Sequence, residues 1–129
     1  MQDQPTPSEI LAAVARFLRE TVAPATTGHL SFNARVAANA LEMSRRQIER
    51  DAPEAAAEAA RLRSILDMDG DLAGLNAELC ARLASGAVTL ETPGLVDHLW
   101  TVTLAKLAVD QPSYWGYRAA LAERGAEDN

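Results

Sequence analysis

Residues 71–86, DLAGLNAELCARLASG, decide the fold class that this sequence predicts. Leucines recur with helical spacing on one face of the stretch, at Leu72, Leu75, Leu79 and Leu83. Asp71 is a typical N-cap, because its carboxylate accepts hydrogen bonds from unpaired backbone N–H groups, and Gly86 is a typical C-terminal glycine. The stretch therefore predicts an amphipathic helix over residues 72–85.

Similar patterns with similar end signals occur along most of the chain. Ser8 is the expected cap of the first helix, Pro24 ends it, Pro53 opens the third and Pro112 breaks the fifth. No alternation typical of a strand extends beyond four residues. The other expected helices cover residues 8–23, 31–51, 53–66, 94–110 and 113–124.

These helices and their short connections predict an all-α fold. We expect a single-domain antiparallel bundle of five to six helices over residues 8–124, with flexible termini at 1–7 and 125–129. The chain has 129 residues, of which 48% are hydrophobic, and that is enough for one domain with its own core.

Charge and cysteine content exclude several classes of protein. The net charge is −6 and the basic residues form no block, which argues against binding to nucleic acid or to an anionic membrane surface. No apolar run approaches the roughly 18 residues that span a bilayer. The polar N-terminus lacks the apolar core of a signal peptide, and Cys80 has no partner for a disulfide, so we expect a cytoplasmic protein.

Several polar residues interrupt the predicted apolar faces. Asn39 follows Phe32 and Val36 in one helical series, and Asn76 projects beside the leucine stripe of residues 72–85. Lys106 lies within the stripe of residues 94–110, Asp110 follows one turn later, and Arg35 lies at the edge of the series that holds Asn39. We therefore expect Asn39, Asn76, Lys106 and Asp110 to be mostly buried.

Two interpretations of these residues remain open. In the first they form a buried network that fixes helix register, with Lys106 paired to Asp110 four residues later. In the second they line a pocket between the helices at 31–51, 72–85 and 94–110, where a desolvated lysine can act as a base or nucleophile. A buried polar group without a partner costs several kcal/mol, which is why one of the two is expected.

No other residues form a recognisable catalytic or cofactor-binding motif. We expect His29 in a loop, His98 on the solvent side of its helix and Cys80 as a packing residue. Neither histidine stands at metal-ligand spacing, so we expect no metal and no cofactor. Tyr114 is expected to dock on the bundle, whereas Trp115 either packs in the core or marks a contact surface.

Three stretches of the chain resemble a small bacterial all-helical family of unknown function. They are LSFNARVAANALEMSRRQIER (30–50), LNAELCARLASG (75–86) and LAKLAVDQPSYWGYR (104–118), and the resemblance extends from about Pro7 to Leu121. It implies genomic neighbours that are aminoglycoside-phosphotransferase-like kinases and acyl-CoA dehydrogenases. It also implies recurrent polar positions at Arg35, Asn39, Asn76, Lys106 and Tyr114, but no catalytic residue.

The sequence favours a non-catalytic accessory protein over an enzyme. Such a protein would bind the kinase-like protein, the dehydrogenase or a second copy of itself through a helix face. The alternative is a ligand-binding protein or small enzyme in which Arg35 or Lys106 holds an anionic group.

Overall fold

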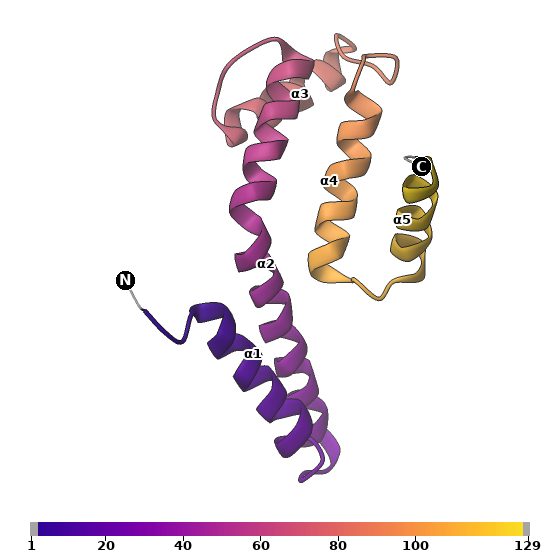
Figure 1. Ribbon diagram of the computed structural model, residues 1–129. Coiled ribbons are helices and arrows are strands. Elements are labelled where there is room, and N and C mark those ends of the chain that lie inside the picture. The colour runs from indigo at the N-terminus through magenta and orange to yellow at the C-terminus, as the bar shows by residue number, and fades with distance from the viewer. Residues whose placement is uncertain (1–2, 128–129) are drawn as a thin grey trace. The chain divides into compact units, whose positions relative to one another are not determined.

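The computed structural model describes residues 3–127, and these confirm the all-α fold class (Figure 1). They form five α-helices and one π-helical segment, and no strand occurs in this range. In chain order the elements are α1 (Pro7–Phe17), η1 (Leu18–Val22), α2 (Gly28–Leu66), α3 (Leu72–Ser85), α4 (Leu95–Asp110) and α5 (Trp115–Glu127). The chain divides into two compact units, Met1–Arg50 (unit 1) and Asp51–Asn129 (unit 2).

The first helix begins earlier than its expected cap. Thr6, and not Ser8, is the N-cap, and its side chain accepts a hydrogen bond from the backbone N–H of Glu9. The Glu9 carboxylate in turn accepts from the backbone N–H of Thr6, which completes a capping box, and Pro7 occupies the first helical position. These hydrogen bonds lower the pKa of Glu9 and leave Ser8 free to donate to Glu49 on α2.

α2 is continuous through Pro53, so the predicted division into helices at 31–51 and 53–66 was wrong. Proline removes one backbone hydrogen bond and crowds the carbonyl four residues earlier, a local penalty that neighbouring turns can absorb. The turns after Pro53 are rich in alanine, the strongest helix former, and this favours continuation. The division between the two units falls in the same turn, after Arg50.

Unit 1 is an antiparallel helical hairpin formed by α1, η1 and the first half of α2. Two hydrogen bonds set its direction: Ser8 near the start of α1 reaches Glu49, and Arg19 in η1 reaches Asn39. The buried hydrophobic residues among positions 3–50 are all alanines, namely Ala15, Ala23, Ala34 and Ala38. The helices therefore meet along a seam of small side chains, which allows close approach but buries little apolar surface.

Several of the larger apolar residues of unit 1 lie outside this seam, whereas Leu11, Leu18, Val22 and Leu41 are half-buried. Phe32 and Val36, which the sequence predicted on an apolar face, are exposed. Met43 in the same helical series is exposed too, as are Val14 and Phe17 on α1. At about 100° per residue, the Phe32 stripe points away from Ala38 and hence away from α1. The predicted stripes are real, but their large side chains do not face the partner helix.

Unit 2 has a larger core, built from the second half of α2, α3, α4 and the loop before α4. Leu62, Leu75 and Leu95 are completely buried, and Ala59, Leu66, Leu79 and Val88 complete the cluster. Arg82 of α3 donates to the carbonyl of Leu66 at the end of α2 (2.9 Å) and pairs with Glu78 (2.6 Å). The hydrogen bond to Leu66 satisfies a carbonyl that the end of α2 leaves unpaired, and it links α3 to α2.

The ends of α3 and α4 match the sequence prediction. The Asp71 side chain accepts from the N–H of Gly74, Gly86 closes α3 with φ +76°, and α4 follows Gly94. α5 continues to Glu127, beyond the predicted end at 124. Of the predicted flexible termini, residues 1–2 and 128–129 lie outside the described part of the chain, and no described helix is long and apolar enough to cross a membrane.

Candidate functional site

The polar residues singled out in the sequence are mainly at the surface. Asn39, Lys106 and Asp110 are exposed, so the prediction that they are mostly buried was wrong, and only Asn76 is half-buried. Arg35 and Tyr114 are exposed as well. Within residues 3–127 neither Lys106 nor Asp110 has an ion pair, which contradicts the predicted buried pair.

The error at Lys106 comes from the orientation of α4. The middle of its buried arc lies roughly 90° away from the stripe that the sequence pattern placed Lys106 in, and the arc is formed by Leu95, His98, Leu104, Ala108 and Val109. The exposed Leu99 is more hydrophobic than the buried His98 and Ala108, so the apolar face that the sequence pattern suggests is rotated away from the buried one. Lys106 therefore lies at the edge of the buried arc, where a flexible lysine reaches water.

Asn76 does take part in a polar cluster of unit 2. Its Nδ2 donates to Glu58 Oε1 on α2 (2.9 Å) and to the carbonyl of Leu72 one turn earlier (3.1 Å). Glu58 and Arg61, both on α2, act electrostatically on His98 of α4. Asn76 was predicted as a site residue, whereas Glu58, Arg61 and His98 were missed.

His98 is the centre of this cluster and the main correction to the sequence analysis. It was expected on the solvent side of its helix, yet it is 2% exposed. Burial, reinforced by the Arg61 guanidinium, lowers the pKa of His98, while Glu58 and Asp97 oppose the shift. The imidazole is therefore neutral at pH 7.

Two nitrogens of this cluster have no hydrogen-bond partner in the described chain, His98 Nδ1 and Arg61 Nε. Such atoms are uncommon in protein interiors. The only sequence signal for His98 was its position three residues after Leu95, on the same helical face. Its near-complete burial keeps it from contact with a substrate, and so we assign it to structure.

The exposed arc of α4 forms an apolar groove together with the preceding loop. Leu90, Val96, Leu99, Trp100 and Thr103 line a hollow of about 310 Å³. Leu90 and Trp100 are among the most exposed large apolar residues of unit 2. Trp100 is 51% exposed and lines this groove.

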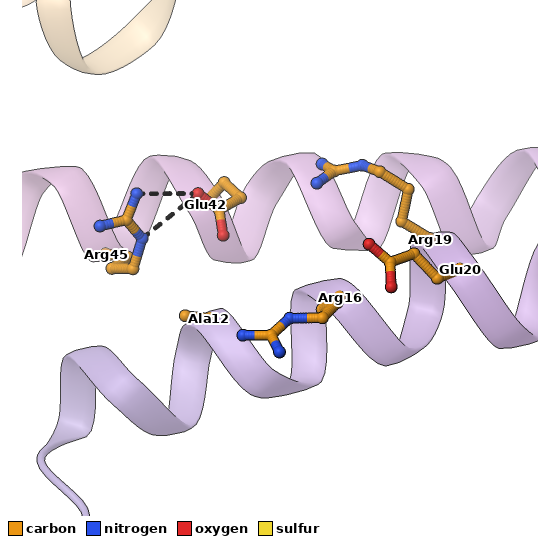
Figure 2. Close-up of a pocket in the computed structure, with 6 residues that line it drawn as sticks. All are labelled: Ala12, Arg16, Arg19, Glu20, Glu42 and Arg45. Carbon is orange, nitrogen blue, oxygen red and sulfur yellow. Dashed lines mark hydrogen bonds and ion pairs between the residues drawn. The ribbon is translucent and has the colours of Figure 1, made fainter.

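A second hollow, of about 260 Å³, lies on unit 1 and is polar (Figure 2). It is lined by Ala12, Arg16, Arg19, Glu20, Glu42 and Arg45. Arg45 is already neutralised, since it pairs with Glu42 (3.0 Å) and Glu49 (2.9 Å), and these bonds raise its pKa. Ser8 and then Arg45 lower the pKa of Glu49. With acids and bases interleaved, this hollow has little net charge for an anion to recognise.

The remaining candidates are also at the surface. Cys80 is exposed, so its predicted role in packing was wrong. Trp115 is exposed and contacts the Tyr114 ring at a centroid distance of 5.7 Å. Among residues 3–127 no group of three histidine, cysteine or acidic side chains is arranged to hold a metal ion.

Comparison with known proteins identifies one family. A family model described as a domain of unknown function, DUF6285, matches residues 24–114, which include α2, α3 and α4. Neither the curated proteins nor the solved structures contain a match to this chain.

Proposed function

This chain belongs to the DUF6285 family of unknown function, and we propose that it is a non-catalytic accessory protein that binds a protein partner through α4. The groove lined by Trp100 is the observation that carries the proposal. Three apolar side chains, Val96, Leu99 and Trp100, follow one another at i, i+3 and i+4 along the helix, and Thr103 continues the row at i+7. This spacing suits a partner helix or an extended apolar segment.

The side chains of the groove support recognition of a protein in preference to a small molecule. The groove is shallow and mainly apolar, and it includes no charged lining residue to fix a small metabolite. Tryptophan is enriched at the hot spots of protein interfaces, and Trp100 is part of an exposed apolar surface here. Asp97, which follows the groove residue Val96 on α4, pairs with Arg124, and neither charged residue lines the groove.

The partner class comes from the family resemblance. Kinase-like proteins of the aminoglycoside-phosphotransferase type and acyl-CoA dehydrogenases are the implied neighbours, and we propose one of these as the partner. The proposal concerns binding, and it assigns no catalytic step to this chain.

Direct binding to the two purified candidates tests the proposal. We expect Trp100→Ala to weaken binding at least tenfold, because a hot-spot tryptophan contributes about 2 kcal/mol or more. Trp115→Ala is the matched control: that tryptophan is also exposed but lies outside the groove, and binding should be unchanged. Absence of binding to either protein at micromolar concentration, or equal loss in both variants, contradicts the proposal.

A second candidate function is binding of an anionic ligand by Arg35 or Lys106. Both are exposed cations without an ion pair in the described chain, and this observation supports binding of an anionic ligand. Acyl-CoA thioesters, sugar phosphates and short organic acids are the probes for a thermal-shift test, in which a bound ligand raises the unfolding temperature. The shift should disappear in Arg35→Gln or in Lys106→Gln, and no shift with any probe rejects the alternative.

A further inference from the structure

Charge is divided unequally between the two units of this chain. Residues 51–129 contain thirteen acidic and six basic side chains, a net charge of −7, whereas residues 1–50 contain five acidic and six basic side chains, a net charge of +1. The groove on α4 belongs to the acidic unit. A surface with such an excess of one sign attracts partners of the opposite sign and repels partners of the same sign.

Acidic side chains flank the row of residues that lines the groove. Glu91 directly follows Leu90, and a hydrogen bond from the Thr89 hydroxyl, together with its own backbone N–H, lowers the pKa of Glu91. Asp110 is exposed and lies seven residues after Thr103, on the same face of α4. Both carboxylates are therefore charged at neutral pH, one beside each end of the row.

The cations near the groove offset only part of this negative charge. Arg124 pairs with Asp97, so these two side chains neutralise each other. Lys106 is exposed three residues after Thr103, at the edge of the groove-bearing face. Residues 87–110, which include the whole lining of the groove, contain three acidic side chains and one lysine, so the local charge has the same sign as that of the unit.

We propose that the occupant of the groove is a basic amphipathic helix of the partner protein. Its apolar side chains pack against Trp100 and the other lining residues, and its lysine or arginine side chains face Glu91 and Asp110. The helix occupies the site of the proposed function, on which this inference rests. α4 extends about 21 Å from Val96 to Asp110 at 1.5 Å per residue, so a segment of about 14 residues matches it in length.

A second copy of this chain is a poorer occupant of the groove. If the grooves of two copies met, each would bring an acidic unit 2 to the other, and the like charges would oppose the contact. Charge complementarity therefore selects a basic segment.

Two synthetic peptides that differ only in charge test the basic helix on the full chain. Both have about 14 residues with leucines at i, i+3, i+4 and i+7, and the other positions carry lysine in one peptide and glutamate in the other. By fluorescence anisotropy, the lysine peptide should bind at least about tenfold more tightly in about 0.1 M salt. Most of the difference should disappear in about 1 M salt, where the Debye length is about 3 Å. Equal binding of the two peptides, or no binding of the lysine peptide, overturns the proposal.

Charge reversals in the protein locate the attraction at the groove. Asp110→Lys should weaken binding of the lysine peptide about threefold and Lys106→Glu should strengthen it by about the same factor, the size expected for exposed charges. Asp69→Lys is the matched control, because Asp69 is a fully exposed acid in the loop between α2 and α3, and binding should be unchanged. If Asp69→Lys weakens binding as much as Asp110→Lys does, the peptide recognises the acidic unit as a whole and the proposal fails.

Trp100→Ala distinguishes failure of the basic helix from failure of the proposed function. It should lower the affinity for the lysine peptide at least about tenfold, whereas Trp115→Ala, outside the groove, should leave it unchanged. If the kinase-like protein or the dehydrogenase binds through Trp100 and the lysine peptide does not bind, the proposed function holds and the basic helix is wrong. If the lysine peptide binds through Trp100 and neither protein binds, the basic helix holds and the proposed partner class is wrong.

Discussion

The two units of this protein place their apolar residues in opposite ways. Unit 1 buries alanines and leaves phenylalanine, valine and isoleucine at the surface, whereas unit 2 buries leucines around Leu62, Leu75 and Leu95. Both units have helices with clear apolar stripes. The difference shows that a stripe of large apolar side chains marks a surface that burial would stabilise. Whether another part of the same chain buries that surface depends on the element that packs against the helix.

The difference also separates two sources of helix stability. The core of unit 2 removes whole leucine side chains from water, and each contributes about 1.5–3 kcal/mol. The seam of unit 1 brings helices close through methyl groups, and its cross-hairpin hydrogen bonds are at the surface, where they contribute little. Substitutions that remove atoms from its core should therefore destabilise unit 2, and substitutions that add atoms to its seam should destabilise unit 1.

The largest expected effect is at the core of unit 2. Leu62→Ala should lower the free energy of unfolding by about 3 kcal/mol, because it leaves a cavity at a completely buried site. Urea denaturation followed by circular dichroism measures the loss. Leu99→Ala, at a partly exposed position on α4, should cost less than about 1 kcal/mol. Equal losses would show that the core is not centred on Leu62.

The opposite substitution probes the seam of unit 1. Ala15→Leu should destabilise the protein by about 2 kcal/mol, because the added atoms force apart two helices that meet through small side chains. Ala13→Leu is the control, since it adds the same atoms two residues away at an exposed position. If Ala15→Leu left the free energy of unfolding unchanged, or if Ala13→Leu lowered it, the result would contradict the alanine seam.

A smaller effect concerns the buried histidine of unit 2. The pKa of His98 is lower in the folded protein than its ordinary value of 6.5, so the unfolded chain binds the proton more readily. His98 therefore favours the folded state fully above pH 6.5, and this contribution is lost as the pH falls below 6.5 toward the lowered pKa. We expect urea midpoints to decrease between about pH 7.5 and 5.5, above the range in which carboxylates titrate.

Replacement of each histidine identifies the group responsible. His98→Gln should remove most of this decrease, whereas His29→Gln, at an exposed position, should retain it. The decisive quantity is the slope with pH, because His98→Gln also changes stability at every pH. An unchanged slope in His98→Gln would show that the imidazole is solvated.

The smallest expected effect is at Lys106, on the exposed arc of α4. Lys106→Ala should change the free energy of unfolding by no more than about 0.5 kcal/mol. In a double-mutant cycle with Asp110→Ala, the coupling energy should be within the error of about 0.3–0.5 kcal/mol. A coupling energy of several kcal/mol would instead show that Lys106 and Asp110 form the buried pair that the sequence pattern suggested.

Prediction from sequence succeeded best at the ends of helices. Asp71 and Gly86 act locally, through hydrogen bonds and backbone angles within a few residues, and α3 begins and ends where these residues predict. α4 begins within one residue of its predicted start and ends before Pro112 as predicted. It failed at Pro53, where a local break signal was overridden by the strong helix formers that follow. Of the predicted site residues, Asn76 alone is half-buried, in contact with Glu58.

The sequence by itself determined the helical class, most helix ends and the presence of an apolar stripe on each helix, because these depend on neighbours along the chain. Only the tertiary structure decided which stripe is buried. On α4 the buried arc includes His98 and Ala108 and leaves Trp100 in the groove, and in unit 1 the alanines face inward. Burial depends on the shape of the surface that a helix meets, and that surface comes from residues far away in the sequence.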